Sequence, residues 1–256
     1  MKIDKIIGIV SCKGGVGKST LAVNLAVALS FFYKKTIGLL DADIYGPNHP
    51  SMLGLTDATA DLIDKLLYPK KKFGISSMSM GYFLKKNSSV LLRGPMVSNT
   101  IKYLFEKTLW GNLDFLIIDF PPGTGDIHLS LLRDITFAGI FLVTTPQIAS
   151  IEDIRRSISM LKKYNMNIYG ILENMKYYYC TNCNFKNIIN SNNIAFQTLI
   201  SEFNITNIYS LPFDITIVNA TNVCTPVIIY DADSVASNTF KNIAMQLIDS
   251  TEHKII

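Results

Sequence analysis

Short apolar runs alternate with longer amphipathic stretches along most of the chain, a pattern typical of parallel α/β proteins. The first run, Lys5–Ser11, is rich in β-branched residues, and the segment from Leu21 to Leu29 has the mixed apolar face of a buried helix. Further runs predict strands at Thr36–Asp41, Phe115–Asp119, Gly139–Thr144, Ile168–Glu173 and Asn207–Leu211. Helical patterns lie between them, at Val97–Leu109, Ile127–Ile135, Ile151–Tyr164, Ile194–Phe203 and Ser234–Ile248.

This alternation predicts repeated βαβ units, and therefore an α/β fold with a mostly parallel central sheet and helices on both faces. In such folds, ligands bind at the carboxyl ends of the strands. We expect a single domain over residues 1–256, with a polar, asparagine-rich insertion at about 176–193. The region Gly54–Lys86 is less regular, and we expect a small hairpin there that covers the site.

Composition narrows the function classes. Although 48% of the 256 residues are hydrophobic, the longest apolar runs reach only about ten residues, so we expect no membrane span. The net charge of +4 comes from scattered lysines, with clusters at Lys70–Lys72 and Lys85–Lys86 that are typical of a solvated surface. The first predicted strand starts too early to leave room for a leader. Four cysteines, two of them in one C-x-x-C pair, indicate a reducing, cytoplasmic setting.

The segment from Lys13 to Thr20 (KGGVGKST) carries the strongest functional signal. It lies between a predicted strand and a predicted helix, which is the context of a phosphate-binding loop rather than of a chance glycine loop. Its glycines let backbone N–H groups turn inward, and the following helix start adds positive potential. Lys18 is expected to neutralise the β- and γ-phosphates of ATP, and Ser19 to bind Mg²⁺. The residues expected around the nucleotide are Gly14, Gly15, Val16, Gly17, Lys18, Ser19 and Thr20.

Two predicted strands deliver acids beside this loop. Phe115–Asp119 has the form of a Walker B strand, and Asp119 is expected to hold Mg²⁺ through water. In the loop that follows, the backbone N–H of Gly123 is expected to be free to approach a γ-phosphate and sense its presence. Asp41 and Asp43 end another strand. We expect Asp43 to orient the attacking water and Asp41 to support the metal shell, although the sequence permits the reverse.

Two later features complete the candidate site. Asn174 and Pro212 follow predicted strands, and we expect them to contact a nucleotide base there. Asn174 also fits a capping or turn role. Cys180 and Cys183 form a C-x-x-C pair, which by itself fits zinc, a redox dithiol or an iron–sulfur cluster. Because one chain supplies only this pair, either metal interpretation favours a site shared at a symmetry axis.

Together these segments resemble a known group. KGGVGKST is the deviant Walker A motif of the MinD/ParA/nitrogenase-iron-protein class. Over about residues 5–248 the chain resembles the Mrp/ApbC iron–sulfur cluster carriers. The motifs that carry this resemblance are DADIYGP from Asp41, LRGPM from Leu92, DFPPGTGD from Asp119, TPQ from Thr145, ENM from Glu173, and the C-x-x-C pair.

The resemblance implies an ATP-hydrolysing carrier that acts as a homodimer. Lys13 would cross to the partner's nucleotide, so that hydrolysis depends on assembly, as it does with an arginine finger. Cys180 and Cys183 of the two chains would together hold one [4Fe–4S] cluster, which supplies the four thiolates such a cluster needs. The cluster would then pass to apo iron–sulfur client proteins.

Departures and a competing function bear on this resemblance. Cys12 stands where the family usually has glycine or serine. We expect it to be a packed small residue, as we do Cys224, although a thiol beside a helix N-terminus can also have a lowered pKa. The competing function is a MinD/ParA-like spatial organiser. It would need a basic amphipathic C-terminal helix or a basic stripe, and Phe240–Ile256 carries only two lysines. We therefore expect neither a membrane nor a nucleic-acid partner.

Overall fold

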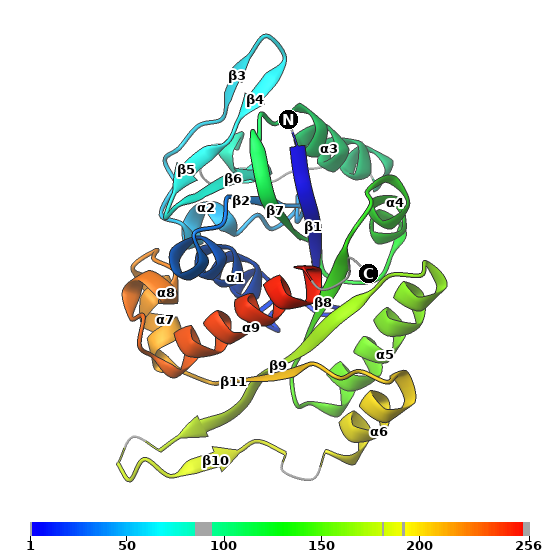
Figure 1. Cartoon of the computed structure of the whole chain (residues 1–256), viewed down its shortest axis with the longest axis vertical. Coiled ribbons are helices and arrows are strands. Elements are labelled where there is room, and N and C mark those ends of the chain that lie inside the picture. The colour runs from blue at the N-terminus through cyan, green and yellow to red at the C-terminus, as the bar shows by residue number, and fades with distance from the viewer. Residues whose placement is uncertain (1, 85–93, 181, 191–192, 253–256) are drawn as a thin grey trace.

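One mostly parallel sheet organises the residues that this computed structural model describes, which are 2–84, 94–180, 182–190 and 193–252 (Figure 1). Its strands are β1 (Lys2–Val10), β2 (Ile37–Asp41), β5 (Lys70–Lys72), β6 (Ile75–Ser79), β7 (Asn112–Asp119), β8 (Gly139–Thr144), β9 (Ile168–Tyr179), β10 (Lys186–Ile188) and β11 (Ile208–Pro212). Their order is β10-β9-β8-β1-β7-β2-β6-β5, with β11 also paired to β9. Within this sheet β5 runs antiparallel to β6 and β10 runs antiparallel to β9, and the other described pairings are parallel.

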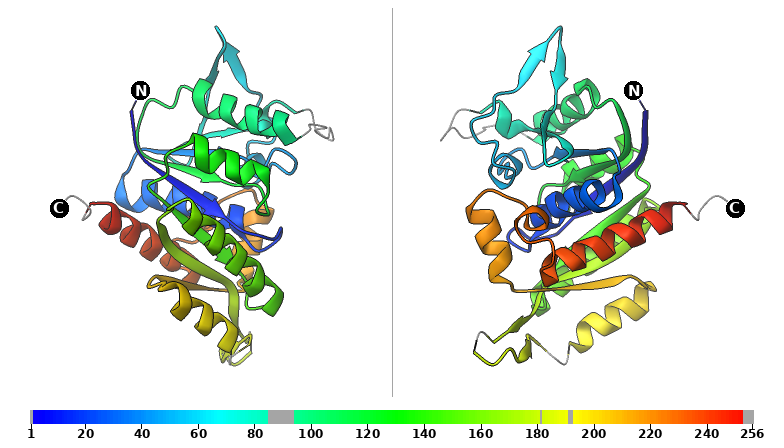
Figure 2. Two further views of the ribbon diagram at one scale, coloured as in Figure 1. Left: turned by 90° about the vertical axis from the view of Figure 1, so that its right-hand side faces the viewer. Right: turned by 60° about the vertical axis from the view of Figure 1, so that its left-hand side comes forward.

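Helices cover both faces of the sheet (Figure 2), so the predicted fold class is confirmed. One face carries α1 (Lys18–Tyr33), α7 (Ile215–Asn222), α8 (Val227–Tyr230) and α9 (Val235–Glu252). The other carries α3 (Gly94–Lys107), α4 (Asp126–Asp134), α5 (Ile148–Lys163) and α6 (Ile194–Phe203). The short helix α2 (His49–Met52) follows β2, and a 3₁₀ turn, η1 (Met80–Tyr82), follows β6. In the described chain, no helix has the length and apolar character needed to span a bilayer.

Alternation along the central strands produces two cores. In β7, Phe115 and Ile117 pack in the core beneath α1 and α9, whereas Leu116 and Ile118 pack in the core beneath α3 to α6. Burying each such side chain contributes about 1.5–3 kcal/mol. These two cores hold the strands in register, and the carboxyl ends of β1, β2 and β7 therefore meet at one edge of the sheet.

Two regions differ from the sequence-based expectation. The strand predicted to end at Glu173 continues as β9 to Tyr179 and turns into β10, because the run of tyrosines favours extended backbone and Tyr177 is buried. The hairpin expected within Gly54–Lys86 exists as β3 (Asp61–Ile63) and β4 (Leu66–Tyr68). It projects from one end of the molecule (Figure 1) and lines no part of the cleft beside the glycine-rich loop described below, so its expected position over the site is wrong. Lys85 and Lys86 lie outside the described residues.

Candidate functional site

The glycine-rich loop joins the end of β1 to the start of α1. Gly15 and Gly17 have φ angles of +77° and +94°, a region that glycine adopts without strain. Gly17 is the N-cap of α1, and among the described side chains none caps the first turn of this helix. The first backbone N–H groups of α1 are therefore left to bind an anion, which is the arrangement of a phosphate site.

This loop forms one wall of a cleft of about 420 Å³. The opposite wall comes from the middle of β9, the end of β11 and α7, and it is partly apolar. The residues of both walls that the sequence analysis singled out are Lys13, Gly14, Gly15, Gly17, Lys18, Ser19, Thr20, Asp43, Asn174 and Pro212. The fold thus brings the predicted phosphate-binding and base-reading residues together. Val16 is buried behind the loop instead.

Asn174 connects the two walls of the cleft. Its side-chain amide Nδ2 donates to the Val16 carbonyl at 2.9 Å, and its Oδ1 accepts the backbone N–H of Met175 at 2.9 Å. A Cβ on Gly17 would lie 2.2 Å from that Nδ2, so this glycine is required sterically as well as for its φ angle. The structure therefore gives Asn174 a role in supporting the loop, and its contact with a nucleotide base stays a prediction.

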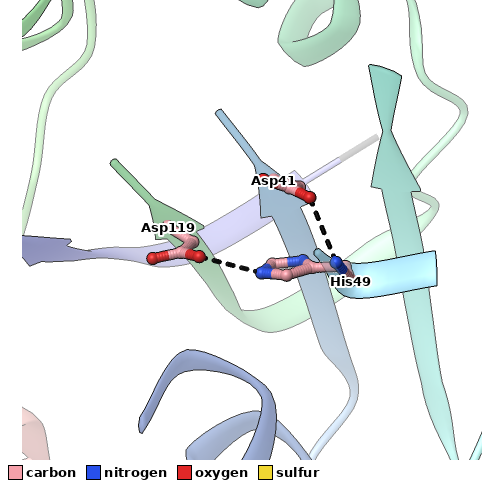
Figure 3. A group of neighbouring side chains, drawn as sticks. All are labelled: Asp41, His49 and Asp119. Atoms are coloured by element: carbon pink, nitrogen blue, oxygen red, sulfur yellow. Dashed lines mark hydrogen bonds and ion pairs between the residues drawn. The ribbon is translucent and has the colours of Figure 1, made fainter. Parts of the chain in front are cut away.

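A buried polar network lies next to the loop, at the carboxyl ends of β2 and β7, and Figure 3 shows three of its members, Asp41, His49 and Asp119. The Lys18 ammonium is 2.6 Å from Asp119 Oδ1, and His49 Nε2 is 3.0 Å from Asp119 Oδ2. Asp41 Oδ2 accepts the backbone N–H of His49 at 3.2 Å and the Ser79 hydroxyl at 3.0 Å. The lysine and the two acids predicted for the nucleotide are therefore neighbours, and in this structure Lys18 pairs with Asp119.

The pKa values of this network follow from burial and from its charges. Burial by itself would raise the pKa of Asp119, but the Lys18 ammonium and the His49 hydrogen bond lower it to about 2. Burial is also the main cause that raises the pKa of Asp41. For His49, burial disfavours the imidazolium, but the carboxylates of Asp41 and Asp119 outweigh it and raise the pKa. Asp119 is thus kept as a carboxylate, the form that binds a cation.

The sequence analysis missed His49. The histidine follows the acidic motif after a turn that contains Gly46 and Pro47, and no periodicity indicates that this turn returns it to the strand ends. A histidine beside a proline at a helix start was the available signal, and it is a weak one.

The positions of Asp43 and Gly123 can be compared with their expected roles. Asp43 lines the cleft, and its Oδ1 accepts the backbone N–H of Gly46 at 3.2 Å. Gly123 was expected to offer a free N–H, but this group donates to the Ser11 carbonyl at 3.0 Å, so the expectation is wrong. The physical reason is that the loop folds back onto the end of β1, and Pro122 is the residue of this turn that faces the cleft.

Lys13 and Cys12 are tied to α5. The Lys13 ammonium lies 3.4 Å from Asp153 Oδ2 while the residue also lines the cleft. The Cys12 sulfur lies 2.7 Å from the Asp153 carbonyl oxygen and 2.8 Å from Ser157 Oγ. Burial raises the pKa of the Cys12 thiol, so the alternative of a lowered pKa is wrong and the packed role is favoured.

Cys180 and Cys183 lie at the tip of the hairpin formed by β9 and β10. The Cys180 N–H donates to the Phe185 carbonyl at 2.9 Å, and the Asn184 N–H donates to the Cys180 carbonyl at 2.9 Å, which closes the turn. The backbone N–H groups of Cys183 and Asn182, with the Cys183 thiol, lower the pKa of Cys180 and favour the thiolate that binds metals. Among the described residues, no third His, Cys, Asp or Glu forms a metal-binding group with the two cysteines.

Comparison with known proteins supports these observations. A family model described as ParA, NUBPL iron-transfer P-loop NTPase, matches residues 2–248. The chain belongs to this family. An iron–sulfur cluster carrier protein of Helicobacter pylori is 39% identical over 247 residues, which cover 96% of this chain and 67% of the relative. A protein of the same description from Methanocaldococcus jannaschii is 40% identical over 256 residues, covering 99% of this chain and 87% of the relative.

Solved structures agree with the family assignment. The nucleotide-binding protein of Archaeoglobus fulgidus, determined in complex with ADP, aligns with a TM-score of 0.77 and 30% identity over 93% of this chain and 92% of its own. The cell-division ATPase MinD of Pyrococcus furiosus aligns with a TM-score of 0.68 over 96% of this chain and 99% of its own, and at 23% identity it shows the fold alone.

Membership of the NUBPL iron-transfer P-loop NTPases confirms the resemblance drawn from the motifs. In this family member, the motifs that begin at Asp41, Asp119 and Glu173 all meet at the phosphate loop. The C-x-x-C motif directly follows the end of β9, the strand that contains the last of them. Leu92 and Arg93, which open another motif, lie outside the described residues.

Proposed function

We propose that this family member binds and hydrolyses ATP with Mg²⁺ and carries an iron–sulfur cluster to other proteins. The observation that carries the proposal is that β9 joins the two sites. Asn174, within this strand, contacts the phosphate loop through the Val16 carbonyl, and Cys180 directly follows its end. A cluster carrier uses both a nucleotide site and thiolate ligands, whereas a spatial organiser has no use for the cysteines.

The residues at the cleft fit a magnesium nucleotide. Ser19 on the wall of the cleft and Asp119, which is buried and paired with Lys18, offer oxygen ligands of the kind that Mg²⁺ prefers, directly or through water. When bound there, Mg²⁺ would neutralise charge on the β- and γ-phosphates. Groups of the chain itself bind the phosphates and orient the water. The first N–H groups of α1 bind the phosphates, Lys18 turns from Asp119 toward them, and Asp43 orients the attacking water.

The role of Asp43 is testable because this carboxylate lines the cleft without belonging to the buried network's ion pairs. Asp43→Asn should bind ATP with parental affinity and hydrolyse it about 100-fold more slowly, because a positioned acid–base group contributes at least about this factor to the rate. A single-turnover assay would measure the hydrolysis rate, and equilibrium binding would measure the affinity for ATP. Parental turnover in Asp43→Asn would assign water orientation to another group, with Asp41 as the next candidate.

The cysteine hairpin favours a homodimer. A [4Fe–4S] cluster takes four thiolates, and Cys180 and Cys183 supply two per chain. Around them the hairpin exposes a set of large apolar side chains, a feature of protein interfaces. They are Tyr178, Tyr179, Phe185, Ile188 and Ile189. We propose that a second chain packs here in the cytoplasm, that the cluster bridges the two hairpins, and that apo client proteins then receive it.

The same dimer gives Lys13 its proposed role. Its ammonium is held by Asp153 of its own chain in this structure, and the residue lies on the wall of the cleft. In the proposed dimer it exchanges this partner for the phosphates bound to the other chain. Hydrolysis then depends on assembly.

Helix α9 argues against the spatial-organiser alternative. Phe240, Ile243 and Leu247 on its apolar side are buried against the body of the protein. Within the described residues this helix therefore keeps no apolar face with which to enter a membrane.

One experiment tests the carrier function directly. The protein is reconstituted anaerobically with iron and sulfide, and its iron, sulfide and zinc are counted together with absorption near 400 nm. Four irons per two chains, transferable to an apo iron–sulfur protein, are expected. One zinc per two chains that resists iron and sulfide would replace the carrier function with a structural zinc clip.

A further inference from the structure

His49 is a fully buried imidazole that the proposed nucleotide reaction does not yet use. It begins α2, and its ring lies between the carboxyl ends of β2 and β7 (Figure 3). The ring reaches Asp119 Oδ2 with Nε2 at 3.0 Å, while the backbone N–H of the same residue donates to Asp41 Oδ2 at 3.2 Å. Asp41 is in turn held by the Ser79 hydroxyl. The imidazole is thus anchored through its own backbone.

The other ring nitrogen indicates how the hydrogen bond runs. His49 Nδ1 is buried and has no hydrogen-bond partner among the described residues. A neutral ring gains nothing from carrying its proton on Nδ1, whereas a proton on Nε2 is donated to the Asp119 carboxylate. An imidazolium would also donate to Asp119 through Nε2. In either form, Asp119 Oδ2 accepts from His49.

Asp119 is therefore held by one group on each of its oxygens. Lys18 holds Oδ1 at 2.6 Å and His49 holds Oδ2 at 3.0 Å. Lys18 lines the cleft and, in the proposed function, turns toward the phosphates, whereas His49 does not line the cleft. Of the two contacts, only the one from His49 stays in place when the nucleotide takes the lysine.

We infer that His49 is a positioning residue, which fixes the orientation of Asp119 for Mg²⁺ while Lys18 exchanges between Asp119 and the phosphates. This inference rests on the proposed Mg²⁺·ATP site. Hydrogen-bond partners behind metal-binding groups commonly change metal affinity or activity about 10–100-fold when they are removed. A nonpolar residue at this position would also leave Oδ2 buried without a described donor, so the carboxylate would be free to rotate.

Direct ligation of the ion by His49 is the competing arrangement. Asp41, His49 and Asp119 each offer one ligand atom, and these atoms lie within 4.8 Å of one another. However, Nε2 already donates its proton to Asp119, so this nitrogen has no lone pair left for a cation while that hydrogen bond is kept. The geometry therefore favours the hydrogen-bonding role.

The test compares His49→Leu, His49→Gln and His49→Asn. Glutamine places an amide nitrogen near the position of Nε2, whereas asparagine is too short to reach Asp119 and leucine cannot donate. For each variant, the affinity for a fluorescent ADP analogue is measured with Mg²⁺ and with EDTA. In His49→Leu and His49→Asn, the factor by which Mg²⁺ raises the affinity for the ADP analogue should be about tenfold smaller than in the parent, while the affinity in EDTA is unchanged. His49→Gln should keep most of this factor.

His128→Leu is the matched control, because it removes another buried histidine, which packs against Phe120 and is not among the described partners that hydrogen-bond or ion-pair with Asp119. Its Mg²⁺ enhancement should match that of the parent. The inference is overturned by an unchanged enhancement in His49→Leu, by equal losses with Mg²⁺ and EDTA, or by a glutamine variant as impaired as the asparagine one. If His49→Leu does not fold, the glutamine and asparagine pair decides.

Two further results separate the possible failures. Mn²⁺ in place of Mg²⁺ allows pulsed electron paramagnetic resonance to detect a directly bonded histidine nitrogen. Such a signal, lost in His49→Gln, would overturn positioning in favour of ligation. A parental protein whose ADP affinity does not respond to Mg²⁺ would instead remove the proposed magnesium site on which this inference rests.

Discussion

Two regions along β9 differ in how completely one chain builds them: the middle of the strand, where Asn174 contacts the phosphate loop, and the cysteine pair that follows its end. Near Asn174 the polar groups are buried and paired, and Asp41 and Asp119 are each at most 1% exposed. At Cys183 the turn lies in solvent, and the side chains around it are large, apolar and exposed. In the proposed function, one chain thus completes the carboxylate that binds the cation but supplies only half of a four-thiolate site. The proposed nucleotide site is preformed, whereas the proposed cluster site depends on a second molecule.

This difference also predicts how substitutions behave. Removing one partner of a buried ion pair costs about 3–5 kcal/mol, because the other charge stays buried. Substitution of an exposed residue usually changes stability by less than about 0.5 kcal/mol. Changes at the loop should therefore affect folding and function together, and changes at the hairpin should affect function alone.

The largest expected effect is at the hairpin. Cys180→Ser should abolish cluster binding after anaerobic reconstitution, because the homodimer would keep only two of the proposed four thiolates, one Cys183 from each chain. Its ADP affinity and thermal stability should match those of the parent. Cys224→Ser is the control, a half-buried cysteine outside the hairpin, and it should keep all of its iron. Iron retained in Cys180→Ser, or lost in Cys224→Ser, would place the cluster elsewhere.

Next in size is Lys18→Met at the loop. Hydrolysis should fall at least about 100-fold through loss of phosphate charge stabilisation. Stability should fall by about 3 kcal/mol, because Asp119 loses the ammonium at 2.6 Å. Urea unfolding and single-turnover hydrolysis measure the two effects. Lys35→Met, which removes a more exposed pair with Glu252, should change neither by much. Parental stability in Lys18→Met would contradict the comparison.

The Asp119 carboxylate should make the stability of the region around the phosphate loop sensitive to acid. Its pKa is lowered to about 2 in the folded protein. An unfolded aspartate titrates near 3.9, so the shift contributes about 2–3 kcal/mol of stability that is present above about pH 4 and is lost as the pH falls toward 2. The difference in unfolding free energy between the parent and Asp119→Asn should therefore shrink between pH 5 and pH 3. A constant difference would indicate that Asp119 is not held as proposed.

The smallest expected change in stability is at Lys13. Its side chain is 41% exposed beside Asp153, so Lys13→Ala should cost less than about 1 kcal/mol. Hydrolysis and ATP-dependent self-association should nevertheless fall together, by about tenfold, which corresponds to about 1.4 kcal/mol of lost transition-state stabilisation. Turnover across a protein-concentration series, with light scattering, measures both. Slower turnover that does not depend on protein concentration would assign Lys13 to its own chain's nucleotide.

Local patterns in the sequence determined the α/β class, the phosphate loop, the acids at the strand ends and the C-x-x-C pair. Each is a contiguous run whose backbone or ligand chemistry acts over a few residues, so no distant partner is needed to recognise it. Only the tertiary structure decided the pairing of Lys18 with Asp119, the place of His49 on that carboxylate and the bond from Gly123 to Ser11. These contacts join segments far apart in the chain, and they form because two hydrophobic cores hold β1, β2 and β7 in register at one edge of the sheet.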